Sequence, residues 1–237
     1  MNNLIAKLTL SASLAASLQL PVVAQQGSST RDSSQGMPTA SEQIAGSEAS
    51  GNKGKLTSPK SLGQASDFFP FKNGAKWDYV DYEGEASRKT HVKTTNINGM
   101  SCYGVAGDFG VTFFAKTKDG IAEVATLDKG KKNPTAYVSP IIVIPSSLEV
   151  GHRWSKDADS YEIVANKIIG GRHFVAVERT RDQGFGTSGD LKVYEKGIGL
   201  VFYELRMLNG MRGHRTISKY NGRKHPFSES LLGAMGL

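Results

Sequence analysis

Short β-prone segments separated by turn residues dominate the chain from residue 67 to residue 225. The segments are rich in Val, Ile, Thr, Phe and Tyr and are six to nine residues long, the length of ordinary strands. They cover residues 90–95, 111–117, 121–127, 161–168, 173–180, 191–196, 200–208 and 214–220. Asn-Gly, Gly-Gly and similar turn sequences lie between them and supply the positive φ that tight hairpins need. Because no sustained helical repeat of apolar positions occurs here, the sequence predicts an all-β, mostly antiparallel domain, a meander of about ten strands.

Two segments depart from this pattern. Residues 137–145, "YVSPIIVIP", form a continuous apolar run interrupted by proline, which predicts a short buried or edge strand. The C-terminal tail, residues 226–237, could form one or two helical turns with Ser228 as the cap and Leu231, Leu232 and Met235 on one side.

The N-terminal 66 residues have a different composition. Residues 1–24 combine a basic start at Lys7, an apolar stretch and small residues before Gln25, which is the layout of a secretory signal peptide. The apolar stretch ends at Pro21 and is too short for a membrane-spanning helix. Residues 25–66 are dominated by Ser, Gly and Gln and predict a disordered linker. We therefore expect an exported protein, periplasmic or extracellular, with its folded domain at 67–225.

The formal net charge of +7 favours acidic partners. Export argues against nucleic acid and leaves anionic lipid, polysaccharide or an envelope protein. Residues 205–228 contain no acidic residue, and five basic side chains there form a candidate anionic-ligand surface: Arg206, Arg212, His214, Arg215 and Lys219. A two-residue turn at Asn209 and Gly210 would place Glu204 opposite Arg215. The segment is either a solvated edge hairpin or a docking surface for anionic lipid or polysaccharide.

No motif predicts catalysis, a cofactor or a metal. The sequence "GFGTSG" at residues 184–189 matches a dinucleotide loop, but a β-prone run follows it, so we expect a hairpin loop. "DADSYE" at residues 157–162 lacks the later ligands and the glycine of a calcium loop. The five histidines lack zinc or protease spacing, and Cys102, the single cysteine, is interpreted as a buried apolar residue.

A Gly-x-x-Trp pattern occurs twice, at Gly74 and Trp77 and again at Gly151 and Trp154. The two copies are about half a domain apart, which suggests two halves that are built alike. Each glycine is expected to start a strand, and each tryptophan to cover an end of the sheet. We therefore expect both tryptophans to be largely buried, and any binding site to lie away from the aromatic stretch at 68–84.

With these motifs the chain resembles a family of exported bacterial β-domains, the TapB-like and related uncharacterised envelope proteins. The family has an opening motif, which Pro70, Gly74 and Trp77 match, a mid-chain Gly-x-x-Trp, and a closing motif that includes Gly197 and Gly199. Further matches are Phe69, Tyr79, Tyr194, Leu200 and Val201. The resemblance implies a strongly curved antiparallel sheet or half-barrel, broadly similar to lipoprotein carriers, and no catalytic residues. The chain departs from lipoprotein relatives because no cysteine lies near the predicted cleavage point.

The sequence is compatible with three functions. The first is a non-catalytic binding module whose curved sheet holds an apolar or anionic amphipathic envelope component, with the basic hairpin at its mouth. The second is a structural or protein-interaction domain of the cell envelope. The third, a hydrolase, has the least support because no acid–base or nucleophile pattern is present.

Overall fold

The computed structural model describes residues 63–84 and 86–237, except for the side chain of Lys93. The predicted signal peptide and residues 25–62 of the predicted linker lie outside the described residues. Within the described part, no helix is both long and apolar enough to cross a membrane.

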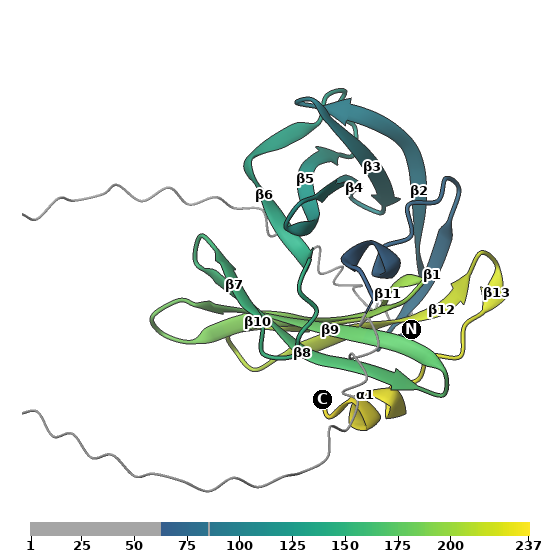
Figure 1. Ribbon diagram of the computed structural model, residues 1–237, viewed down its shortest axis with the longest axis vertical. Coiled ribbons are helices and arrows are strands. Elements are labelled where there is room, and N and C mark those ends of the chain that lie inside the picture. Colours follow the sequence, from purple (N-terminus) through teal and green to yellow (C-terminus); the bar gives the residue numbers. More distant parts are fainter. Residues whose placement is uncertain (1–62, 85) are drawn as a thin grey trace, which may run out of the picture. The chain divides into compact units, whose positions relative to one another are not determined.

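Thirteen strands form a single antiparallel sheet, so the predicted fold class is confirmed (Figure 1). The first half contains β1 (Lys76–Asp81), β2 (Ala86–Ile97), β3 (Met100–Gly107), β4 (Gly110–Thr117), β5 (Gly120–Asp128) and β6 (Thr135–Pro145). The second half contains β7 (Arg153–Lys156), β8 (Asp159–Ile169), β9 (Arg172–Asp182), β10 (Thr187–Glu195), β11 (Gly199–Arg206), β12 (Arg212–Tyr220) and the short β13 (Arg223–Lys224).

The sheet consists of two six-stranded meanders joined side by side. Its order is β6-β5-β4-β3-β2-β1-β12-β11-β10-β9-β8-β7, and β13 pairs with β12. The strands β2–β6 curl over the other half, so that the sheet nearly closes into a barrel (Figure 1). The two edge strands are β6 and β7. The proline-containing run thus forms an edge strand, one of the two predicted alternatives, but with 11 residues β6 is not short. The indole Nε1 of Trp154 on β7 donates a hydrogen bond of 3.0 Å to the carbonyl of Ile142 on β6 and links the two edges.

The Gly-x-x-Trp pattern has the same local structure in both of its copies. Gly74 and Gly151 have φ of +76° and +88°, conformations that favour glycine. Each tryptophan donates its indole N–H to a distant backbone carbonyl, Trp77 to Ile198 at 2.7 Å and Trp154 to Ile142. The expected burial is confirmed for Trp77, which is 5% exposed, whereas Trp154 is only half-buried because it lies on an edge strand.

The chain before β1 fills part of the space inside the curved sheet. A 3-10 helix, η1 (Ala65–Phe68), places Phe68 in a cluster with residues of β5, β6, β8 and β9, among them Ile163 and Val175. The fold therefore begins earlier than the predicted boundary at residue 67, because Ala65 is itself buried. The closing motif meets this segment: Gly197 N–H donates to the carbonyl of Asp67 at 2.7 Å.

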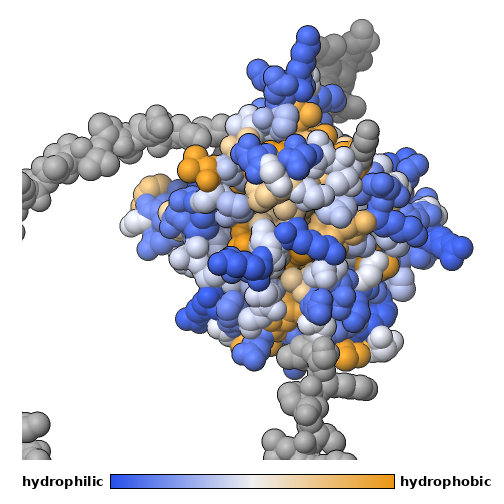
Figure 2. Space-filling model, turned by 45° about the horizontal axis from the view of Figure 1, so that its top comes forward, coloured by the Kyte–Doolittle hydropathy of each residue, from blue (hydrophilic) through white to orange (hydrophobic). Residues whose placement is uncertain are grey.

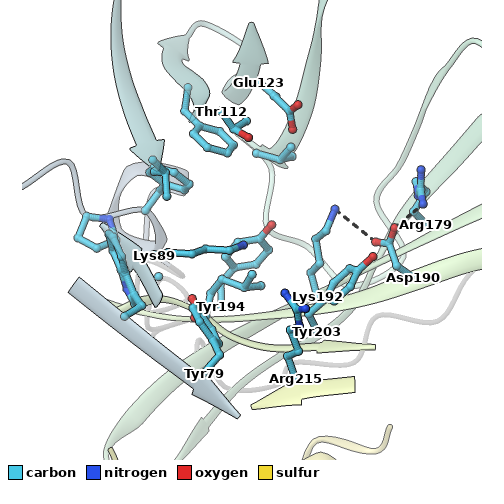
Figure 3. Close-up of a pocket in the computed structure, with 18 residues that line it drawn as sticks. Tyr79, Lys89, Thr112, Glu123, Arg179, Asp190, Lys192, Tyr194, Tyr203 and Arg215 are labelled. Carbon is cyan, nitrogen blue, oxygen red and sulfur yellow. Dashed lines mark hydrogen bonds and ion pairs between the residues drawn. The ribbon is translucent and has the colours of Figure 1, made fainter. Parts of the chain in front are cut away.

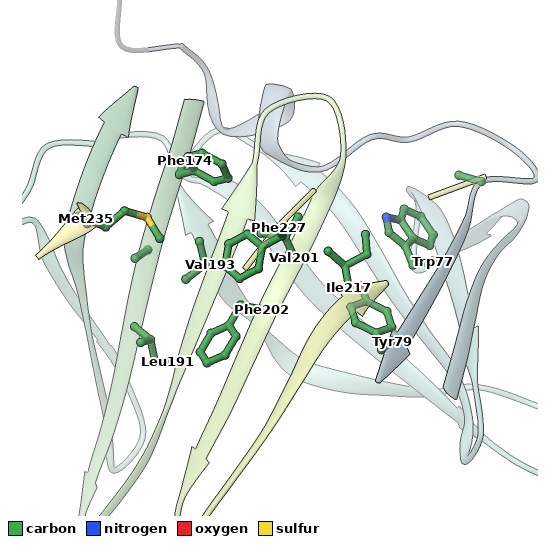
Figure 4. Close-up of a cluster of buried hydrophobic side chains, with 13 residues drawn as sticks. Trp77, Tyr79, Phe174, Leu191, Val193, Val201, Phe202, Ile217, Phe227 and Met235 are labelled. Carbon is green, nitrogen blue, oxygen red and sulfur yellow. The ribbon is translucent and has the colours of Figure 1, made fainter. Parts of the chain in front are cut away.

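The C-terminal tail covers the opposite, convex face of the sheet. A short helix, α1 (Ser230–Met235), forms as expected, with Glu229 rather than Ser228 at its N-cap. Phe227 stacks on Phe202 and meets Phe174 edge-on, and Met235 joins the same cluster (Figure 4). His225 is also buried, and its Nε2 lies 3.1 Å from the Glu195 carboxylate, which fastens the tail to the end of β10.

Two other predictions for individual segments are confirmed. Cys102 is fully buried on β3 among apolar side chains. The "GFGTSG" sequence forms the loop and first residues of the hairpin between β9 and β10.

Candidate functional site

The concave face of the sheet encloses a cavity of about 390 Å³, a size typical of small-molecule sites (Figure 3). The interior is therefore only partly filled by the segment around η1. One wall is apolar and includes Phe69, Val105, Phe114 and Val143. The rest carries an unusual number of polar and charged side chains, contributed by β1, β2, β4, β5 and β9–β12: Tyr79, Lys89, Thr112, Glu123, Arg179, Asp190, Lys192, Tyr194, Tyr203 and Arg215.

Strand alternation explains how these polar groups come to face inward. On β10, Asp190, Lys192 and Tyr194 line the cavity, whereas Leu191 and Val193 point to the cluster on the convex side. Both faces of this strand are therefore covered. The charged face, which would normally meet bulk water, instead meets the cavity.

Cations outnumber carboxylates in the lining. Lys89, Arg179, Lys192 and Arg215 are opposed by Asp190 and Glu123 only. Asp190 is 3% exposed and is held by Arg179 at 2.6 Å and by Lys192 at 3.3 Å (Figure 3).

Glu123 lies across the cavity from this cluster (Figure 3). It accepts a hydrogen bond of 2.6 Å from the hydroxyl of Tyr137, which lies outside the cavity lining. Its carboxylate therefore has a partner of its own. Among the described residues, Lys89 and Arg215 form no ion pair with any carboxylate.

The surroundings of Lys89 in the cavity change the pKa of its amine. Loss of hydration, together with the nearby charges of Lys192 and Arg215, lowers the pKa of its amine to about 8. Its Nζ lies 5.6 Å from the centre of the Tyr79 ring, a cation–π contact that compensates only part of the lost hydration. The fold thus holds a cation in the cavity without supplying its counter-ion.

Phenol groups complete the lining. Burial raises the pKa of Tyr203 to about 12 and raises the pKa values of Tyr79 and Tyr194 further, so all three remain neutral hydroxyls at physiological pH. The Tyr79 hydroxyl donates to the carbonyl of Leu200 at 2.8 Å. A set of cations and neutral hydroxyls is suited to binding an anion.

The structure separates the five residues of the predicted anionic-ligand surface. Only Arg215 lines the cavity. Arg206 is paired with Glu204 and Glu178, Arg212 is exposed at 3.8 Å from Glu204, and Lys219 is exposed.

His214 lies on the other face of β12, where it stacks on Phe202 and its Nε2 lies 2.9 Å from Glu229. The five residues therefore do not form one surface.

The register of the β11–β12 hairpin also differs from the predicted one. The β11–β12 hairpin closes through residues 207–211 rather than through a two-residue turn, because Met207 N–H bonds to the Met211 carbonyl. The register moves by one residue, so His214 rather than Arg215 lies opposite Glu204. The predicted pairing of Glu204 with Arg215 was wrong.

The expectation that any site would avoid the opening aromatic stretch does not fit the cavity either. Phe69, Pro70, Trp77 and Tyr79 all belong to its lining. The prediction also missed Lys89 and Lys192. Their only sequence signal is an isolated lysine within a β-prone run, which is equally typical of a solvent-facing position.

No group of three or more potential metal ligands occurs in the described ranges. The calcium-like residues at 157–162 form the β7–β8 turn and the start of β8, where Asp159 forms an ion pair with Arg181 at 2.7 Å.

Comparison with known proteins shows similarity to solved structures alone. Neither the family models nor the curated proteins searched give a match. A crystal structure of a "putative lipoprotein" from Parabacteroides distasonis aligns with a TM-score of 0.31 and 10% identity over 65% of this chain and 98% of that chain.

Proposed function

We propose that this domain is a non-catalytic binding module that holds an anionic amphipathic molecule on the concave face of its sheet. The observation that carries this proposal is the pair of cations, Lys89 and Arg215, that face the cavity without a carboxylate partner among the described residues. A partly buried charge without a counter-ion is costly, and a bound anion would lower that cost.

The lining suggests the chemistry of the ligand. An anionic head group such as a carboxylate or phosphate would lie between the Lys89 amine and the Arg215 guanidinium. Its apolar chain would contact the wall formed by Phe69, Phe114 and Val143. The predicted signal peptide and the resemblance to exported envelope β-domains support a periplasmic or extracellular site for this binding.

Isothermal titration with decanoate, below its micellar concentration, tests the proposal. We expect saturable binding of one decanoate per chain, and much weaker binding of decyltrimethylammonium, which has a similar chain and the opposite charge. The Lys89→Met/Arg215→Met variant should lose decanoate binding at least tenfold, about 1.4 kcal/mol. The matched Lys219→Met variant, altered at an exposed lysine of β12, should bind as the original chain does. Equal binding of both amphiphiles, or no effect of the double variant, would contradict the proposal.

The second candidate, a protein-interaction domain of the envelope, is favoured by one observation. The edges of β6 and β7 are not paired with each other as a ladder, and Val138 on β6 is fully exposed. An unpaired edge can accept a strand from another chain. A pulldown that compares the original chain with its Val138→Lys variant, altered on β6, tests this function separately from the cavity.

A further inference from the structure

One end of the curved sheet carries most of the exposed large apolar side chains. Since neighbouring strands are antiparallel and follow chain order in each half, every turn from an odd to the next even strand lies at the same end. These turns are residues 82–84, 108–109, 129–134, 157–158, 183–186 and 207–211, and we call them the tip rim.

Six of the ten exposed large apolar residues of the described chain belong to the tip rim, although the rim is a small part of it. Phe185 is 82% exposed, Phe109 74%, Tyr82 62% and Met211 55%, and Met207 and Leu208 accompany them. At the other end the hairpin turns Asn98–Gly99, Lys118–Asp119 and Asn221–Gly222 are short and polar. The exposed large apolar residues there are Val150, in the longer connection between β6 and β7, and Ile168. The contrast between the two ends indicates a function for one of them, because scattered exposed apolar residues need no explanation but a concentration does.

The tips are neighbours in space as well as in topology. Leu208 lies against the β9–β10 loop, with its Cδ2 3.2 Å from the position that a Cβ on Gly186 would occupy. Tyr82 lies near the start of β12, its ring edge 3.7 Å from such a position on Gly213. Neighbouring tips of the rim therefore lie close together at these two places.

The concave face opens toward the same rim. A second cavity, of about 280 Å³, shares Lys89, Val105 and Arg215 with the first and extends to Phe109 at the β3–β4 tip and to Asp128 at the end of β5. A molecule that enters or leaves the interior along this path passes between the apolar tips.

We propose that the tip rim docks on a lipid membrane surface, with Phe185, Phe109 and the Met207–Met211 loop inserted among the lipids. Single aromatic and aliphatic side chains on separate hairpin tips suit a fluid interface, whereas a protein interface favours a continuous complementary patch. Hydrophobic residues on the face in Figure 2 likewise occur as small groups among hydrophilic ones.

Charges on the rim add little net attraction. Lys129, Lys131 and Lys132 in the β5–β6 loop are exposed and suit anionic lipid head groups, but Glu83 and Asp108 on other tips offset them. Apolar insertion is therefore the main contribution, and binding should persist at high salt concentration.

Co-sedimentation with vesicles of phosphatidylethanolamine and phosphatidylglycerol tests this proposal. We expect the full chain to bind, and Phe185→Ser to lower the partition coefficient about tenfold, roughly 1.4 kcal/mol. The matched control is Ile168→Ser, which removes an apolar side chain that is 66% exposed beside the β8–β9 turn, at the opposite end. This control should leave vesicle binding unchanged.

A second readout does not depend on affinity. Because Cys102 is fully buried, an environment-sensitive dye can be attached selectively to Phe185→Cys or Ile168→Cys. Vesicles should shift the emission of the dye to the blue at position 185 and not at position 168. Absence of vesicle binding, which would point to a protein partner for the rim, or equal effects at both positions would overturn the proposal. The Lys89→Met/Arg215→Met variant should still bind vesicles, so failure of the rim and failure of the cavity are distinguishable.

Discussion

Replacement of Lys89 by methionine should make the unliganded protein more stable and its binding of anions weaker. Methionine has a similar length and volume but needs no hydration. Lys89 lies in a cavity with Lys192 and Arg215 nearby and with no carboxylate partner among the described residues. If the charge of Lys89 is there to bind a ligand and does not stabilise the fold, its removal should increase the free energy of unfolding.

The magnitude follows from the pKa. Burial and neighbouring cations lower the pKa of Lys89 from 10.5 to about 8, and each pKa unit corresponds to about 1.4 kcal/mol. The full difference amounts to about 3 kcal/mol, and the water that reaches this half-buried amine reduces it to roughly 1–3 kcal/mol.

The pH dependence has a definite sign. Below about pH 8 the Lys89 amine is charged in both the folded and the unfolded chain, so the cost of burying this charge lowers the free energy of unfolding by its full amount. As pH rises from about 8 to 10.5 the folded chain releases its proton first, and stability rises.

Urea denaturation of both proteins at about pH 7 and about pH 9.5 measures the effect. Lys89→Met should be more stable at the lower pH, and the difference should shrink at the higher one. The tyrosines whose pKa is raised by burial lose their stabilising contribution only above about pH 10, outside this window. Lys219→Met should show neither effect. A variant that is less stable than the original chain at both pH values would refute the argument that Lys89 is an uncompensated cation.

Two further substitutions test how the fold is held together. Burial raises the pKa of Glu195, but hydrogen bonds from His225 and Arg172 outweigh this effect and hold the pKa below its usual range. The ionised Glu195 carboxylate therefore stabilises the fold above about pH 4.5. Glu195→Gln should therefore cost about 3 kcal/mol at neutral pH in urea denaturation and little at acid pH, and a uniform loss would contradict this account. Gly199→Ala should lower the unfolding free energy by about 1–3 kcal/mol, since φ is +100° and a Cβ would lie 3.1 Å from Pro70 Cδ; unchanged stability would show that the two motifs need not pack so closely.

The sequence was sufficient for the fold class because hairpin chemistry is local. Asn-Gly and Gly-Gly turns between β-branched runs determine antiparallel neighbours, and the paired Gly-x-x-Trp motif correctly indicated two similar halves. The boundaries were less accurate. Ala65 and Phe68 belong to the core only because the distant strands β5, β6, β8 and β9 surround them.

The candidate site was harder to predict because it depends on which face of each strand points inward. Lys89 and Lys192 stand in runs that also fit a solvent-facing polar stripe, and only closure of the sheet turns that stripe into a cavity lining. The basic hairpin failed as a single surface for the same reason. Alternation along β12 sends His214 and Arg215 to opposite faces, and a one-residue change in register gives each of them a different partner on β11.

A crystal structure of the chain with decanoate bound tests the central claim most directly. The account predicts the carboxylate within hydrogen-bond distance of the Lys89 amine and the Arg215 guanidinium, with the alkyl chain against Phe114 and Val143 on the concave face. Decanoate bound instead near His214 on the convex face, with the cavity unchanged, would contradict it.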